Sequence, residues 1–269
     1  MTRPPILDNK YPIADSVFVP AALMREARRQ KNITEADVPS VCLLDPDGDL
    51  VRHLRRTGRS QTFKAWPCYH TELDVFSLAG RDVGIIGRAV GASFAVLVAE
   101  ELFASGCRLL ISLTSAGQIV ASGPPPYFII IDRALRDEGT SYHYASPADY
   151  ADACPQLLAS AVAAVKQDNP KTITGSTWTT DAPFRETPQA IQAAADRGIL
   201  AVEMEAAALY AFAEARGCKV LCLAHVTNTM AQSGADFEKG EDDGAVDALA
   251  VLGSLVEALA KEPGHILAD

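Results

Sequence analysis

Three features that mark common classes of protein are missing from this sequence of 269 residues. Positive charge is not in excess, because the formal net charge is −10. A protein that binds the phosphate backbone of nucleic acids normally presents a basic face. No stretch approaches the roughly 18 apolar residues of a membrane span, and the opening Met-Thr-Arg-Pro-Pro lacks the apolar segment of a signal peptide. We therefore expect a cytoplasmic protein with no nucleic-acid and no membrane partner.

Cysteine spacing argues against a metal site. The sequence has neither a Cys-x-x-Cys pair nor the Cys/His spacing that is typical of zinc ligands. We expect no metal and no cofactor. The six cysteines are expected to be reduced, buried and apolar in character: Cys42, Cys68, Cys107, Cys154, Cys218 and Cys222.

What the sequence does contain is typical of one α/β domain. Hydrophobic residues make up 48% of the chain, and short β-rich runs alternate with alanine-rich helical segments, as in a sheet covered by helices on both faces. We predict strands at Val41–Leu44, Asp82–Ile86, Leu109–Leu113, Tyr127–Ile131, Thr172–Thr177, Leu200–Val202 and Val220–Val226. Helices are predicted from about Leu50 and at Phe94–Ser105, Pro155–Gln167, Thr187–Arg197, Ala206–Arg216 and Ala245–Lys261. We expect a single domain over residues 1–269, with residues 1–35 forming a peripheral helix or arm.

Two small-residue segments follow predicted strands, where ligands collect in sheets of this kind. Gly87–Ser93, which contains Arg88 and Gly91, lacks the spacing of a P-loop or a dinucleotide fingerprint, and tight strand-to-helix packing explains it equally well. Thr114–Gln118 is predicted as a turn. Its hydroxyls and closely spaced backbone N–H groups suit an anion or a sugar oxygen, although an ordinary turn has the same composition.

A third segment, residues 179–185, brings a carboxylate, an aromatic ring and a guanidinium together after a strand. A planar base could stack on Phe184, beside Asp181 and Arg185. Alternatively, Phe184 fills the core and Asp181 caps the helix that is predicted to begin near Thr187.

Two carboxylates stand where a strand-like run gives way to an alanine-rich helix. In the segment Val-Glu-Met-Glu, Glu203 and Glu205 flank Met204. Alternate residues of an extended segment point the same way, so the two acids could share a face, and one could accept hydrogen bonds from paired sugar hydroxyls. The alternative is that both are solvated acids in the first turn of the helix, where the macrodipole favours them.

Segments in this order resemble the nucleoside phosphorylase and nucleosidase superfamily from about Val41 to Lys261: GRAVGASFAVLVAEEL, ISLTSAGQI, RDEGTSYHY, TTDAPF and VEMEAAALY. The resemblance implies a three-layer α/β/α sandwich with a twisted mixed central sheet. It also implies cleavage of a nucleoside's N-glycosidic bond by orthophosphate, giving free base and pentose 1-phosphate, in a homo-oligomer that is a dimer or a hexamer. A hydrolytic nucleosidase and a nucleoside-binding protein without turnover are the alternatives.

The resemblance also implies roles for single residues. Glu205 would bind the ribose hydroxyls, with Met204 packed against the sugar, and Phe184 or Pro183 would line the base site. Catalysis would come from placing the acceptor below the anomeric carbon and stabilising the departing base, so Glu205 need not be a general base. The catalytic candidates are Glu205, Arg88 and Asn228, and the substrate-binding candidates are Gly91, Ser115, Ala116, Gly117, Asp181, Phe184, Arg185, Glu203 and Met204.

The acceptor side departs from the family pattern. Phosphorolytic members usually carry Gly-Asp-Pro-x-Arg after the first strand, whereas residues 45–49 read Asp-Pro-Asp-Gly-Asp. A second family arginine is replaced by Ser112, and a third, from a neighbouring subunit, falls near Tyr69. A buried phosphate dianion needs charge-assisted partners, so a site without them should bind phosphate poorly. Arg88 is either the replacement or an exposed arginine with no role.

The base side departs as well. Purine-cleaving members usually place an aspartate at the end of the last central strand, where this sequence has Asn228. An amide donates a hydrogen bond but is not a general acid. Uridine phosphorylase-like members also have asparagine there, which favours a pyrimidine or a base that needs no ring protonation. Arg185 either replaces their uracil-reading arginine or lies on the surface.

Three further features have a simple and a functional interpretation. His143 lies in a family-like segment and lines the pocket or a subunit contact. His225 is predicted to be a satisfied core residue. The acidic run at residues 238–243 is most simply a solvated mobile loop, and alternatively a lid over the base.

Overall fold

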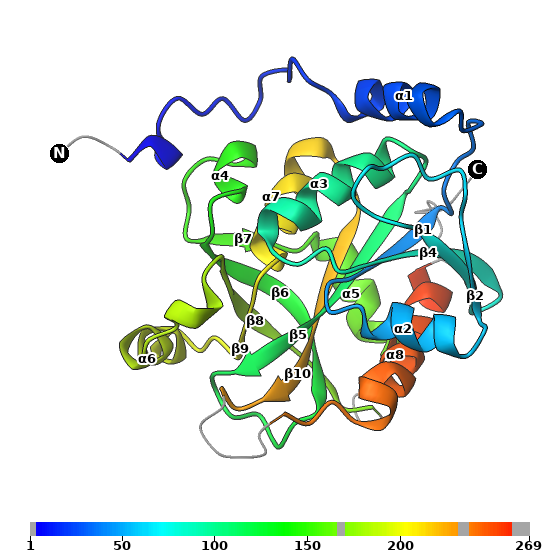
Figure 1. Ribbon diagram of the computed structural model, residues 1–269. Coiled ribbons are helices and arrows are strands. Elements are labelled where there is room, and N and C mark those ends of the chain that lie inside the picture. The colour runs from blue at the N-terminus through cyan, green and yellow to red at the C-terminus, as the bar shows by residue number, and fades with distance from the viewer. Residues whose placement is uncertain (1–3, 166–169, 231–236, 260–269) are drawn as a thin grey trace.

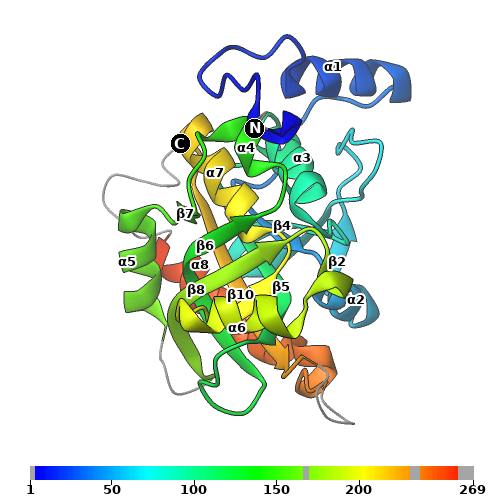
Figure 2. The ribbon, with the colours of Figure 1, turned by 90° about the vertical axis from the view of Figure 1, so that its left-hand side faces the viewer.

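A mixed β-sheet with helices on both faces forms the centre of the computed structural model, which describes residues 4–165, 170–230 and 237–259 (Figures 1 and 2). The strands are β1 Val41–Asp45, β2 Ser60–Thr62, β3 Asp74–Leu78, β4 Arg81–Gly87, β5 Leu109–Gln118, β6 Tyr127–Asp137, β7 Tyr150–Asp152, β8 Thr172–Thr180, β9 Ala201–Glu203 and β10 Val220–Asn228. The α-helices are α1 Pro20–Lys31, α2 Asp49–Arg56, α3 Ala92–Phe103, α4 Ser141–Tyr144, α5 Pro155–Ala164, α6 Pro188–Asp196, α7 Ala206–Arg216 and α8 Ala245–Leu259. Short 3₁₀ helices are η1 Pro5–Leu7, η2 Pro183–Arg185 and η3 Glu241–Gly244.

The sheet closes on itself at one end. Its strand order is β10-β6-β8-β9-β5-β1-β4-β3-β2, and β10 also pairs with β5, so β5, β9, β8, β6 and β10 make a ring. β1 is parallel to β4 and β5, and β5 is parallel to β10. The carboxyl ends of these four strands therefore meet at one edge, where Asp45 lies opposite Gly87.

Two apolar cores lie on opposite faces of the sheet. Because consecutive strand residues point to opposite sides, Leu44 and Ile86 pack with α3 and α7, whereas Leu43 and Ile85 pack with α2 and α8. The result is helices, sheet and helices in three layers (Figure 1). The predicted sandwich with a mixed central sheet is confirmed.

The strand β5 corrects one sequence-based expectation. Residues 114–118 were predicted as a turn, but they continue β5 to its end. Gly117 and Gln118 pair with β9, and Gly117 also lies opposite Asn228 of β10. Partners on both sides hold these small residues extended, which the local composition alone does not indicate.

The N-terminal residues that the structure describes lie at the periphery of the fold. Residues 4–19 comprise η1 with turns and bends, and α1 follows; both lie outside the layer that contains α3 and α4 (Figure 1). Within the described residues, no helix is long and apolar enough to cross a membrane.

The cysteines follow the prediction in part. All six are free, and Cys42, Cys68, Cys107 and Cys222 are buried. Cys154 is exposed at the start of α5 and Cys218 is half-buried, so the prediction of burial is wrong for these two.

Candidate functional site

The carboxyl group of Glu205 lies between the first residues of two helices. Glu205 immediately precedes α7, and its Oε1 accepts the backbone N–H of Gly91, which immediately precedes α3, at 2.7 Å. Gly91 has a φ of +89°, a conformation that glycine adopts most readily. Glu205 is 1% exposed, and its Oε2 is buried without a hydrogen-bond partner within the described part of the chain. Oε1 is thus anchored, whereas Oε2 is a buried acceptor that no described residue satisfies.

The surroundings of Glu205 favour the protonated acid. Burial, followed by the neighbouring Glu203, raises the pKa of Glu205 to about 8, while the Gly91 N–H and the Thr114 hydroxyl act in the opposite direction. Asp47 adds a further upward contribution to this pKa. A protonated carboxyl has an O–H donor as well as acceptor positions, so it can both give and receive a hydrogen bond with a sugar hydroxyl.

Glu203 is occupied within the protein. Its Oε1 accepts the hydroxyls of Thr177 at 3.1 Å and Thr179 at 2.5 Å, and its Oε2 accepts the N–H groups of Glu205 at 2.6 Å and Ala206 at 2.7 Å. It therefore satisfies otherwise unpaired donors at the start of α7 and holds the turn that carries Glu205. Glu203 and Glu205 are 3% and 1% exposed, so the interpretation of both as solvated acids is wrong.

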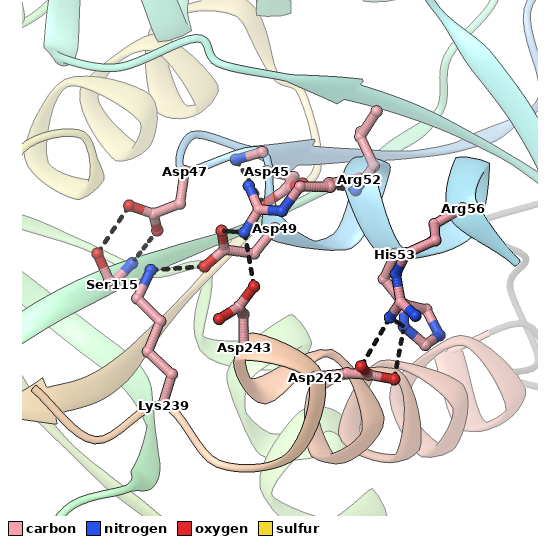
Figure 3. A network of polar contacts seen from close by, with 12 residues as sticks. Asp45, Asp47, Asp49, Arg52, His53, Arg56, Ser115, Lys239, Asp242 and Asp243 are labelled. Atoms are coloured by element: carbon pink, nitrogen blue, oxygen red, sulfur yellow. Dashed lines mark hydrogen bonds and ion pairs between the residues drawn. The ribbon is translucent and has the colours of Figure 1, made fainter.

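The turn after β1 presents an acid to β5. The Asp45 carboxylate is buried and accepts the N–H groups of Gly48 at 3.2 Å and Val51 at 2.9 Å, and burial raises its pKa to about 7. Asp47 reaches across to Ser115: its Oδ2 accepts the backbone N–H at 2.7 Å, and its Oδ1 accepts the hydroxyl at 2.8 Å (Figure 3). The segment Thr114–Gln118, which was predicted to suit an anion, thus binds the carboxylate of Asp47 from the same chain.

Arg88 lies beside the same turn. Its N–H donates to the Asp45 carbonyl at 2.9 Å, and a Cβ placed on Gly48 would lie 3.1 Å from Arg88 Cγ. The Arg88 backbone has a φ of +67°, which non-glycine residues rarely adopt and which often marks functional sites. The side chain is exposed, lines a cavity of about 430 Å³ with Phe94 and His70, and makes no ion pair with any residue the structure describes. Arg88 thus offers an uncommitted guanidinium at the edge where β1 and β4 end.

Asn228 ends β10 at this edge of the sheet. It lies opposite Gly117 of β5, and Val226 lies opposite Ala116. The Asn228 Oδ1 accepts the N–H of Met230 at 2.9 Å, and a side chain on Gly117 would collide with the Met230 sulfur. The predicted acceptor, sugar and base residues of β5 and β10 are therefore neighbours.

A model of the Phosphorylase superfamily matches residues 40–260. The chain belongs to this superfamily. It is 29% identical over 171 residues to a guanosine phosphorylase of Halorubrum lacusprofundi, a match that covers 60% of this chain and 68% of that protein. It is 28% identical over 156 residues to a DeoD-type purine nucleoside phosphorylase of Shewanella denitrificans, covering 55% of this chain and 64% of the relative. The predicted family is confirmed.

Solved structures of the superfamily share the fold. A uridine phosphorylase of Vibrio fischeri ES114, complexed with 6-hydroxy-1-naphthoic acid, superimposes with a TM-score of 0.71 at 22% identity, covering 87% of this chain and 99% of that one. A purine nucleoside phosphorylase of Toxoplasma gondii, in complex with immucillin-H, gives a TM-score of 0.70 at 15% identity, covering 82% and 91%. At these identities the likeness concerns the fold alone.

The segment at residues 181–185 follows β8 and is mostly exposed in this superfamily member. Phe184 is 99% exposed, so the interpretation that it fills the core is wrong. Asp181 accepts the Gly139 N–H at 2.9 Å, and the hydroxyl of Thr187 itself caps α6, which removes the capping role suggested for Asp181. Arg185 is exposed on η2. The structure thus leaves Phe184 and Arg185 at the surface and engages Asp181 with the loop before α4.

Among the histidines, His225 differs from expectation. Its ring is 7% exposed and stacks on Phe128 with centroids 4.5 Å apart, but Nε2 has no hydrogen-bond partner among the residues described. Burial lowers the pKa of His225 to about 4, which keeps the imidazole neutral. His225 is thus a core residue as predicted, but the prediction that its ring is satisfied is wrong for Nε2. His143 lines a cavity of about 760 Å³ between the N-terminal arm and α3.

The acidic run before α8 is bound to α2. Asp242 contacts His53 at 3.3 Å and Arg56 at 2.6 Å, and Asp243 contacts Arg52 at 2.8 Å (Figure 3). Lys239 reaches Asp49 at 2.5 Å. The run 238–243 is thus exposed to solvent except for the half-buried Lys239, and Asp242 and Asp243 pair with basic residues of α2.

Proposed function

We propose that this protein cleaves the N-glycosidic bond of a nucleoside and that Glu205 holds the ribose. The proposal rests on the two oxygens of the Glu205 carboxyl. Oε1 accepts the Gly91 N–H, while the buried Oε2 has no hydrogen-bond partner among the described residues. A buried polar atom without a partner is costly, and a sugar hydroxyl would satisfy it. The group lies close to the edge where β1, β4, β5 and β10 end, as expected for a binding site in such a sheet.

The reaction requires positioning and electrostatic stabilisation from the protein. Positive charge develops on the sugar ring and negative charge on the leaving base, so a fixed ribose and a donor to the base both lower the barrier. In the proposal, Glu205 fixes the ring and the Asn228 amide donates to the base without transferring a proton. Glu203 contributes by holding the turn that positions Glu205.

We propose orthophosphate as the acceptor, supported by the named activities of the curated relatives and by Arg88. The exposed Arg88 guanidinium has no ion pair within the described chain, and it can grip a phosphate through two parallel hydrogen bonds. Its side chain packs on Gly48, the residue after Asp47. The acceptor would bind between Arg88 and Ser115.

Hydrolysis is the second candidate, because Asp47 places a carboxylate on Ser115. A carboxylate at an acceptor site repels phosphate and can orient water through a hydrogen bond. The hydrolytic candidate keeps Glu205 in the same role and differs only in the acceptor.

A nucleoside panel with and without orthophosphate tests the proposal. Purified full-length protein is incubated with purine and pyrimidine ribonucleosides and deoxyribonucleosides, and free base, pentose 1-phosphate and free pentose are quantified by chromatography. We expect base release that requires phosphate and yields pentose 1-phosphate. Base release without phosphate would assign hydrolysis instead. Nucleoside binding with no base release in either buffer would contradict the enzymatic proposal.

A further inference from the structure

The carboxylate of Asp47 occupies two donors that an oxyanion would use. Asp47 Oδ2 accepts the Ser115 N–H at 2.7 Å, while Oδ1 accepts the Ser115 hydroxyl at 2.8 Å (Figure 3). Two short hydrogen bonds to adjacent, negatively charged oxygens are also what two oxygens of a phosphate would make with the same donors. The anion position on β5 is thus filled by an acid from the turn after β1.

A well-braced turn delivers this acid. Asp45 binds the N–H groups of Gly48 and Val51, and Gly48 has a φ of +77° with the Arg88 side chain packed against it. The Asp47 side chain itself is exposed and makes only the two Ser115 hydrogen bonds among the described residues. The backbone is therefore held in place, while the carboxylate can rotate into water once its two bonds are broken.

We propose that Asp47 determines acceptor specificity: it is an internal anion that competes with orthophosphate for Ser115 and weakens phosphate binding. The inference rests on the proposed function, because it concerns the acceptor position of the same site. A phosphate ion arriving at Ser115 must displace the carboxylate and then remain close to its negative charge, whereas a water molecule has no charge to be repelled. Asp47 thereby shifts the balance of acceptors towards water, and Arg88 shifts it towards phosphate.

Isothermal titration of inorganic phosphate into the full-length protein, with and without substitutions, tests the proposal. We expect Asp47→Ala to lower the phosphate Kd about tenfold or more, because it removes both the competitor and its charge. Asp47→Asn should give a smaller decrease, since the amide oxygen can still accept one Ser115 bond. Thermal unfolding and circular dichroism establish that each variant keeps its fold, as expected for an exposed side chain.

Asp49→Asn is the matched control. It removes the same charge two residues away, but the Asp49 carboxylate contacts Arg52 and Lys239, both at 2.5 Å, and makes no contact with Ser115. We expect its phosphate Kd to stay within about threefold of the parent. If Asp49→Asn tightens phosphate binding as much as Asp47→Ala does, the effect is one of general charge and the proposal is overturned.

The remaining outcomes separate this inference from the proposed function. An unchanged phosphate Kd in Asp47→Ala, or no phosphate binding by any variant, overturns the role of Asp47. Tighter phosphate binding by Asp47→Ala in a protein that cleaves no nucleoside would support the competition and remove the enzymatic proposal. Where cleavage occurs, the ratio of pentose 1-phosphate to free pentose should rise in Asp47→Ala, and an unchanged ratio counts against Asp47 as the acceptor determinant.

Discussion

The proposed ribose side and the proposed acceptor side of the candidate site are built in opposite ways. On the ribose side, Glu203 and Glu205 are almost fully buried. The carboxylate oxygens of Glu203 accept hydrogen bonds from donors of β8 and of the start of α7. On the acceptor side, Asp47 and Arg88 are exposed and extend from turns at the ends of β1 and β4. The ribose side therefore belongs to the buried core. The acceptor side consists of exposed side chains on turns, which can change conformation more easily.

This contrast has an energetic basis. A buried carboxylate without full hydrogen bonding is costly, so a group such as Glu205 persists only where the surrounding structure holds it. Exposed side chains on turns can change with little effect on folding. A phosphorylase-like fold can thus keep a buried acid such as Glu205 while exposed turn residues such as 45–49, which we propose influence the acceptor, differ.

Replacement of Glu205 is expected to have the largest effect. Glu205→Ala removes the group that we propose holds the ribose, and we expect kcat/KM for nucleoside cleavage to fall about 1,000-fold. The control is Glu214→Ala, which removes an exposed acid of the same helix, α7, and should leave kcat/KM unchanged. Steady-state kinetics on both variants, together with circular dichroism to establish folding, checks this. Cleavage by a folded Glu205→Ala protein at the parent rate would remove Glu205 from the site.

Replacement of Glu203 should act on stability. Glu203→Ala leaves two buried hydroxyls and two N–H groups without their acceptor, and we expect the free energy of unfolding to fall by about 3 kcal/mol. Urea denaturation of this variant beside Glu214→Ala measures the difference. A loss no larger than that of the exposed control would show that the ribose side does not depend on Glu203.

The raised pKa of Glu205 predicts how stability depends on pH. Its pKa is about 8 in the folded protein against 4.5 for an unperturbed glutamate, so between these values the folded state keeps a proton that the unfolded state releases. The free energy of unfolding should therefore fall as pH rises through this window, by up to about 5 kcal/mol from Glu205, at about 1.4 kcal/mol per pKa unit. Asp45, with a pKa of about 7, contributes in the same direction.

Glu205→Gln isolates the contribution of Glu205, because the amide does not titrate and its oxygen can still accept the Gly91 N–H. Urea denaturation at pH 5 and pH 8 should show a clearly smaller decrease for this variant than for the parent. An equal decrease in both proteins would mean that Glu205 does not titrate in this range.

Sequence reasoning reached the parts of the molecule that depend on local pattern. The bounds of α7, Ala206–Arg216, agree with those predicted, because an alanine-rich run ends at a glycine, and Gly217 indeed adopts a left-handed conformation there. The Glu-Met-Glu segment was placed correctly at the junction of β9 and α7. The family and the fold were predicted from short sequence motifs that occur in the same order as in the family.

The parts that escaped prediction depend on contacts between distant residues. Asp47 and Ser115 are 68 positions apart, and Asp242 lies 186 positions from its partner Arg56. Nothing nearby in the sequence shows the partners of these acids, so local pattern does not predict the contacts. The extension of β5 through Gly117 likewise requires β9 and β10, which come much later in the chain.

The smallest expected effect concerns the ion pairs between α2 and η3, which border the acceptor side. Exposed pairs contribute little singly, so the double variant Asp242→Ala, Asp243→Ala should lower the free energy of unfolding by only about 1 kcal/mol. Glu241→Ala, an exposed acid of the same 3₁₀ helix, is the matched control. Because salt screens such pairs, the difference between the two proteins should shrink in 1 M NaCl. A loss of several kcal/mol that persists in high salt would show that this part of the acceptor side is as firmly built as the ribose side.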